Sequence, residues 1–243
     1  MRTRRVQLQS AWLLHQRPYS DSSRILELLT RDFGRVTLFA RGVRGGGDRS
    51  GWRAALQPFN RLLVGWSGSG DGGRLTGAET AGPPACLPPE RLLMGFYLNE
   101  LLLRLLARED PHVGLFDHYG EALRGLAIDT EPEAALRRFE RRLLEELGYG
   151  IDFEHDAGGI GLDPAARYRF QAGIGFVAVP SAAVDDGLAG SELLAVAAER
   201  YENVAVRNAA RRVFRDAIAV CLDGRELGSR AVFVDIRQRE QGR

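Results

Sequence analysis

The feature that most constrains this chain is a change in its hydrophobic period at Gly82-Pro-Pro84. Before this point, short apolar runs alternate with polar residues and are separated by glycine-rich turns. The runs long enough to form strands cover residues 6–15, 25–30, 35–41, 62–66 and 74–79. Because none of them has a helical period, the pattern predicts a small five-stranded β-barrel of the OB type. Closure of the barrel also removes exposed strand edges.

After this point the apolar residues recur at helical spacing. Helices are predicted over 92–106, 113–126 and 131–148, and Gly148 is expected to end the third as a left-handed cap. A hairpin over 168–179 and helices over 191–199 and 203–222 follow. We therefore expect an α+β multidomain protein, with an N-terminal OB-fold β-barrel, a mainly α-helical domain and a small C-terminal α/β region. The predicted domains are residues 1–82, 83–150 and 151–243, the last packed with the helical domain.

Charge is distributed unevenly along the chain. Residues 1–82 carry 13 arginines against six acids, although the whole chain has a net charge of only +1. Two interpretations remain open: a basic module that meets a polyanion such as nucleic acid, or arginine as the general surface cation of a chain without lysine. No apolar run is long enough for a membrane span, and none follows the basic N-terminus as in a secretory signal. We expect a cytoplasmic protein.

No residue pattern is typical of a catalytic or metal centre. Cys86 and Cys221 are far apart, and neither belongs to a CxxC pair. The glycine-rich stretch 42–47 lacks the ending of a nucleotide-binding loop. Adjacent carboxylates such as Glu145 and Glu146 point apart on a helix. We therefore expect no enzyme activity, no catalytic residue, no cofactor and no bound metal.

Arginines and aromatic residues interleave in the barrel segment, and this pattern is more informative. OB barrels bind single strands through basic grooves and rings that stack on bases. The candidate nucleic-acid-binding residues are Arg35, Arg41, Arg44, Arg49, Arg53 and Trp52. Trp52 stands beside a glycine in a polar loop, which favours an exposed ring. The rings of Phe39, Phe59 and Trp66 are more typical of core residues.

Several stretches resemble a known family, in order along the chain. They are residues 15–30, 34–44, 56–59, 66–68, 97–102, 135–140, 146–150 and 222–230. Tyr97-Leu-Asn-Glu-Leu-Leu102 and Leu222-Asp-Gly-Arg-Glu-Leu-Gly-Ser-Arg230 are two of the longer ones. Their order and spacing are similar to those of the RecO family of bacterial DNA repair and recombination mediators.

The resemblance implies an OB-fold that binds single- and double-stranded DNA, so that complementary strands anneal. It also implies partnership with RecR and contact with the C-terminal tail of single-stranded-DNA-binding protein, which allows RecA to load on coated strands in the nucleoid. The alternative class is an OB-fold RNA-binding or translation-associated module, which the same basic barrel also suits.

Two departures from the family pattern affect these expectations. Many members carry four cysteines in the C-terminal region and bind zinc, whereas residues 151–243 contain only Cys221. We therefore expect a zinc-free member. Gly228 stands where the family usually has lysine, which puts a cationic role at that position in doubt.

Arginines also gather beside the apolar stripe of the helix predicted over 131–148. One interpretation is a solvated face that pairs with glutamates of the same helix, namely Glu133, Glu140, Glu145 and Glu146. The other, favoured by the resemblance, is a docking site for the acidic tail of single-stranded-DNA-binding protein. Its candidate residues are Arg137, Arg138 and Arg141, with Arg142 beside them.

Overall fold

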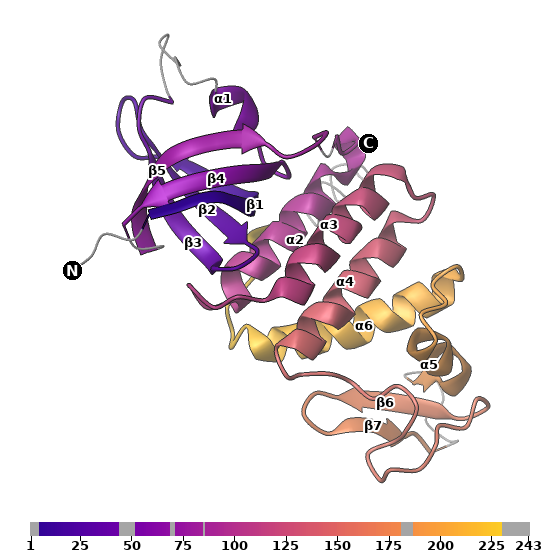
Figure 1. Cartoon of the computed structure of the whole chain (residues 1–243). Helices are drawn as coiled ribbons and strands as arrows, with labels where there is room; N and C mark the ends of the chain where they lie inside the picture. Colours follow the sequence, from indigo (N-terminus) through magenta and orange to yellow (C-terminus); the bar gives the residue numbers. More distant parts are fainter. Residues whose placement is uncertain (1–4, 44–51, 69–70, 85, 181–186, 230–243) are drawn as a thin grey trace. The chain divides into compact units, whose positions relative to one another are not determined.

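A computed structural model describes residues 5–43, 52–68, 71–84, 86–180 and 187–229 (Figure 1). The chain divides into two compact units, one formed by Met1–Ala127 with Leu227–Arg243 and the other by Ile128–Glu226. The chain therefore leaves the first unit once and returns to it near its C-terminus. The expected domain boundaries after residues 82 and 150 stay a prediction.

A closed five-stranded barrel begins the first unit, as the alternating pattern predicts. The strands are β1 (Arg5–Pro18), β2 (Arg24–Thr30), β3 (Gly34–Ala40), β4 (Arg61–Ser67) and β5 (Asp71–Thr80). They follow one another around the barrel in the order β1-β2-β3-β5-β4, which fits an OB-fold. The β3–β5 pair is parallel and the others are antiparallel. A short helix, α1 (Trp52–Ala55), precedes β4.

Alternation along each strand decides which side chains fill the barrel. Between β2 and β3, the register pairs Leu26 with Leu38 and Leu28 with Val36, and these four side chains point into the core. Their neighbours along the strands point to the outer surface of the barrel. The same alternation fills the interior from the other strands with Leu13, Leu62, Val64, Trp66 and Leu75.

Two helices of the first unit lie against the barrel (Figure 1). They are α2 (Leu92–Leu105), which follows the short helix η1 (Pro89–Arg91), and α3 (Val113–Ile128). Asn99 of α2 is buried, donates to the carbonyl of Leu14 at 2.7 Å, and accepts a hydrogen bond from the hydroxyl of Tyr119. Burial raises the pKa of Tyr119 above its ordinary value, so this hydroxyl remains a donor.

The turn between β2 and β3 requires glycine. Gly34 has a φ of +64°, and a Cβ there would lie 2.1 Å from the carbonyl oxygen of Asp110. The segment between α2 and α3 therefore runs directly over the start of β3. The backbone N–H of Glu109 donates to the carbonyl of Arg35 at 3.0 Å and fixes this approach.

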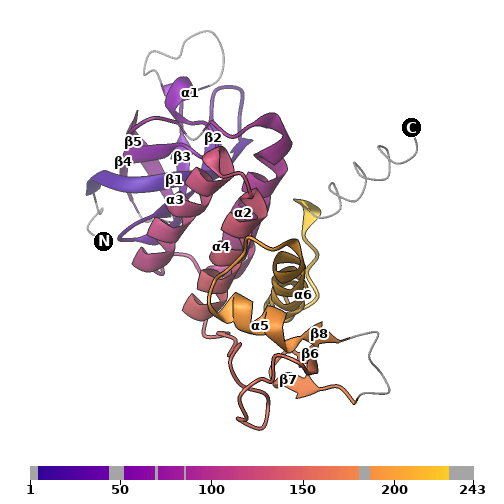
Figure 2. The same cartoon turned by 90° about the vertical axis from the view of Figure 1, so that its right-hand side faces the viewer.

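The second unit combines helices with a small antiparallel sheet of order β7-β6-β8. Its elements are α4 (Pro132–Glu146), β6 (Arg167–Gln171), β7 (Gly175–Ala178), β8 (Leu188–Ala189), α5 (Gly190–Ala197) and α6 (Val204–Cys221). The predicted hairpin is therefore confirmed as β6–β7. Figure 2 shows α5 and α6 beside this sheet, and the rings of Phe153, Phe176 and Phe214 pack together in the core.

Local signals set the helix ends in this unit. Gly148 follows α4 with a φ of +81°, which confirms the predicted cap. The side chain of Asn203 accepts from the backbone N–H of Ala205 at 2.8 Å and caps α6. Within the described ranges, no helix has both the length and the apolar character needed to cross a membrane.

Candidate functional site

Arg35, the first candidate on the barrel, has its guanidinium engaged within the protein. Its Nη1 lies 3.3 Å from a carboxylate oxygen of Glu27, and its Nη2 donates to the carbonyl of Leu106 at 3.2 Å. Only 13% of its side chain is exposed. Arg108 and Thr37 also contact the Glu27 carboxylate. This end of the barrel surface is therefore a covered polar network rather than an open groove.

The other candidates on the barrel differ in accessibility. Arg41 and Arg53 are exposed. Trp52 is half-buried and packs against the barrel core, so the expectation of an exposed ring is met only in part. Trp52 is the first residue of α1, a helix that the sequence pattern did not predict. Arg44 and Arg49 lie outside the described residues.

The aromatic rings of the barrel separate into core and surface. Phe59 and Trp66 are buried, as expected. Phe39 instead lies on the outer surface of β3 and is half-buried. Its partner is Tyr19, a residue that sequence reasoning did not single out, at a ring centroid distance of 5.1 Å. The available signal was an aromatic residue directly after Pro18 in a polar turn.

Three of the four arginines of α4 are engaged with neighbouring carboxylates. Arg137 and Glu140 form an ion pair at 2.8 Å, with side chains only 7% and 2% exposed. Arg141 bonds Glu145 at 2.9 Å, and its Nη1 donates to the carbonyls of Val196 and Ala197. Arg142 contacts both Glu145 and Glu199. The interpretation of pairing with glutamates of the same helix is thus correct for Glu140 and Glu145.

Arg138 is the exposed member of this group. Its guanidinium lies over the ring of Tyr201, 5.5 Å from the ring centroid. Burial raises the pKa of the Tyr201 hydroxyl to about 12. A cation held over a ring at the surface remains available to an anion that approaches from solvent.

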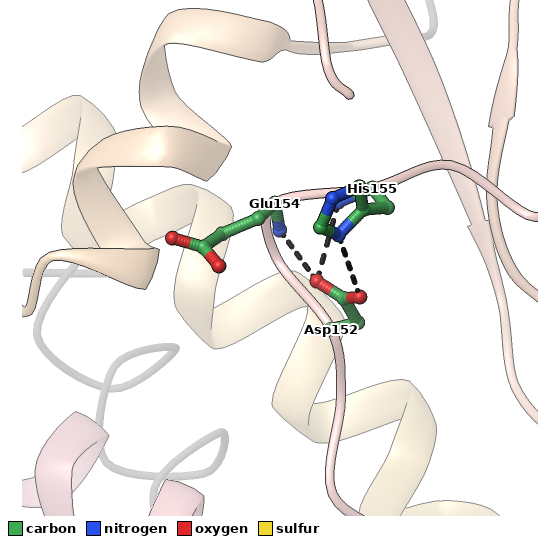
Figure 3. Close-up of side chains that lie close together, drawn as sticks. All are labelled: Asp152, Glu154 and His155. Atoms are coloured by element: carbon green, nitrogen blue, oxygen red, sulfur yellow. Dashed lines mark hydrogen bonds and ion pairs between the residues drawn. The ribbon is translucent and has the colours of Figure 1, made fainter. Parts of the chain in front are cut away.

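A group of exposed polar side chains lies in the loop after α4 (Figure 3). Asp152, Glu154 and His155 each offer a ligand atom, and these atoms lie within 4.8 Å of one another. The Asp152 carboxylate already accepts from the backbone N–H of Glu154 at 2.8 Å, and its other oxygen lies 2.9 Å from His155 Nδ1. Hydrogen bonds from Glu154 and His155 hold the pKa of Asp152 below its ordinary value. The arrangement is that of a carboxylate-stabilised turn.

Comparisons with known proteins cover nearly the whole chain. The family model described as "Recombination protein O N terminal" matches residues 3–84. The model described as "Recombination protein O C terminal" matches residues 88–214. The first range coincides with the barrel, and the second contains all the helices from α2 to α5 and most of α6.

Curated relatives agree with these matches. A protein of Haemophilus influenzae (strain 86-028NP) named DNA repair protein RecO is 43% identical over 230 residues, covering 93% of this chain and 95% of the relative. A protein of the same name from Alkalilimnicola ehrlichii is 44% identical, covering 94% of this chain and 91% of the relative. One from Halorhodospira halophila is 41% identical and covers 96% and 98%.

Proposed function

The chain belongs to the RecO family of DNA repair proteins, and from this premise we propose that it is a non-catalytic mediator that binds single- and double-stranded DNA through its barrel. The observation that carries the proposal is a set of exposed arginines on the barrel. These are Arg17, Arg41, Arg53 and Arg74. Arg17, Arg41 and Arg74 form no ion pair with another described residue, so their charge is available to phosphate groups.

Annealing follows from the same charges. Two complementary strands repel each other, and a cationic surface that binds both reduces this repulsion. Arginine suits this role because its planar group contacts phosphate and also stacks on bases. We propose that the protein anneals strands in this way and acts in the cytoplasm on DNA of the nucleoid.

Partners are proposed from the family. We propose that the protein works with RecR and helps RecA to load on strands coated by single-stranded-DNA-binding protein. Arg138 supports contact with the acidic tail of that protein, because it is the exposed cation of α4 and lies beside an aromatic ring. Arg137 and Arg141 would then shape the site from within the unit rather than meet the tail directly.

The test of DNA binding is the salt dependence of affinity for a short single strand. The double variant Arg41→Glu, Arg53→Glu should bind more weakly, and each lost phosphate contact should reduce the log–log salt slope by about 0.7. Arg35 is left unchanged because an acid there would face Glu27 and perturb the fold. The control variant Arg124→Glu, Arg200→Glu makes the same charge change at two exposed positions that are not in the barrel strands.

Two outcomes would overturn the proposal. An unchanged slope in the Arg41 and Arg53 variant, or an equal loss in the control, would move the DNA site away from this surface. Tighter binding to RNA than to DNA of the same sequence would favour the alternative of an RNA-binding module.

A further inference from the structure

Only part of the barrel's outer surface is open. The outer side of β1 is covered where Trp12 packs against Phe116 and Tyr119 of α3. The start of β3 is covered by the segment that follows α2, through the bonds of Arg35 to Leu106 and of Glu109 to Arg35. At the opposite end of β2 and β3 the exposed residues are 17–22, from the end of β1 and the turn that follows it, together with Arg41, whereas Ile25 of β2 is buried.

A single cross-strand row crosses this end of the barrel. The register pairs Arg17 with Ile25, Ile25 with Phe39, and Phe39 with Arg74. Directly paired residues point to the same side of a sheet, and here that side is the outer one, because Leu26 and Leu38 point inward. Four strands thus place an aromatic ring in the interior of the row and an exposed arginine at each end. At one strand spacing per step, the arginines stand roughly 14 Å apart along the row.

Tyr19 adds a second ring to this row. It lies edge-on to Phe39, with an interplanar angle of 65°, and 63% of it is exposed. The turn that carries it is fixed by two backbone hydrogen bonds, from Tyr19 to the carbonyl of Ser23 and from Val43 to the carbonyl of Ser22. Gly72 of β5 lies beside the Phe39 ring, since a Cβ there would come 3.6 Å from it. The Tyr19 ring therefore packs against Phe39 and keeps most of its surface in solvent.

We propose that Tyr19 and Phe39 form the site at which an unpaired base of single-stranded DNA stacks, with Arg17 and Arg74 holding the phosphates on either side. This inference rests on the proposed function and adds to it a preference for single-stranded over double-stranded DNA. An aromatic ring between two cations suits a base with its flanking phosphates. The ring stacks on the face of the base, and the guanidinium groups pair with the negatively charged phosphates. The bases of a duplex are already stacked on each other. The arginines therefore contribute to the affinity for a duplex, but Tyr19 does not.

The experiment compares affinities for an unstructured single strand and for a duplex of the same length. Tyr19→Ala should weaken single-strand binding about ten-fold and leave its salt slope unchanged, because stacking releases no counterions. Its duplex affinity should stay at the wild-type value. Tyr19→Phe should keep wild-type affinity for both, since it keeps the ring. Tyr149→Ala, which removes an exposed tyrosine of the second unit, is the matched control.

A second measurement does not depend on how the variants fold. In the wild-type protein, a single strand that contains 5-iodouracil should cross-link on irradiation to the peptide that carries Tyr19 or Phe39. If the wild type binds single strands but Tyr19→Ala binds them equally well, or the cross-link lies on another peptide, the stacking site is wrong while the proposed function stands. If the wild type binds no DNA, the proposed function fails as well.

Discussion

Arg137 and Glu140 form an ion pair that is almost completely shielded from water. Removing one member of such a pair takes this partner away from the other, buried charge, and such a loss costs about 3–5 kcal/mol. We therefore expect Arg137→Ala to lower the free energy of unfolding by this amount, measured by urea denaturation. The double variant Arg137→Met, Glu140→Leu should recover most of the loss, because no charge then remains buried.

Arg138→Ala is the matched control, because the side chain is exposed and its removal should change stability by less than about 0.5 kcal/mol. It is also the variant that tests tail binding: calorimetry should give weaker binding of the acidic tail peptide, with single-strand binding nearly unchanged. Full stability of Arg137→Ala would mean that the ion pair contributes little, and wild-type peptide affinity in Arg138→Ala would remove Arg138 from the proposed site.

The sequence pattern predicts which side chains of a strand point outward, but it does not predict which of these are exposed. The alternation of β3 places Phe39 and Arg41 on one face, but it does not say which part of that face a distant segment covers. Arg35 therefore resembles Arg41 in the sequence, although residues 106–109 bond to Arg35 while Arg41 is exposed. Tyr19 was missed because a turn residue has no periodicity that marks its exposure.

At the scale of elements, the loop after α4 is held by carboxylates. Asp156 accepts from the backbone N–H groups of Gly158 and Ile160 at 2.8 and 2.9 Å, and Asp152 does the same for Glu154. A backbone hydrogen bond from Leu162 to Glu154, at 2.8 Å, closes the loop. Such bonds order a loop without a metal. The zinc-free expectation stays a prediction, and this network supports it.

We therefore expect purified protein to contain no stoichiometric metal, and a chelator to leave its Tm unchanged. Asp156→Ala should lower the Tm by a few degrees, because two backbone donors lose their acceptor. Elemental analysis and calorimetry measure these quantities. One equivalent of zinc, or a Tm that falls with chelator, would contradict the prediction and point to Asp152, Glu154 and His155 as the ligands.

The order of strands and helices was predictable because each has a strong local period. The hydrophobic period of a segment does not predict which elements pack together in space. The sequence places α2, α3 and α4 in one helical stretch, whereas α2 and α3 belong to the compact unit of the barrel and α4 to the other. Side chains such as Asn99 and Tyr119, which bond to each other beside β1, decide this grouping through contacts distant in sequence.

At the scale of the whole molecule, one carboxylate fixes the point at which the chain returns to the first unit. Glu100 of α2 accepts from the backbone N–H groups of Gly228 and Ser229 at 2.8 and 2.9 Å, and from the Ser229 hydroxyl at 2.7 Å. These residues belong to two of the stretches that carry the family resemblance. The bond to Gly228 comes from the backbone, so it does not require the lysine that the family usually has there.

Glu100→Ala should therefore release the returning segment. Removing the acceptor of three donors should cost about 1–3 kcal/mol, and hydrogen exchange at residues 227–229 should become faster. Glu90→Ala, at an exposed position of η1, is the control for losing one acid and should change neither quantity. Unchanged exchange in Glu100→Ala would show that other contacts hold the segment.

The stability that Glu100 contributes should depend on pH in a defined direction. Partial burial acts to raise the pKa of Glu100, but the hydrogen bonds from Ser229 and Gly228 and the charge of Arg104 outweigh it, so the pKa lies below the ordinary value of 4.5. A carboxyl whose pKa is lowered by folding stabilises the folded state when ionised. The contribution is therefore fully present above pH 4.5 and is lost as the pH falls through the lowered value. The stability difference between wild type and Glu100→Ala should shrink in that window, and a difference that stays constant into strong acid would mean that the carboxylate charge is not what holds the segment.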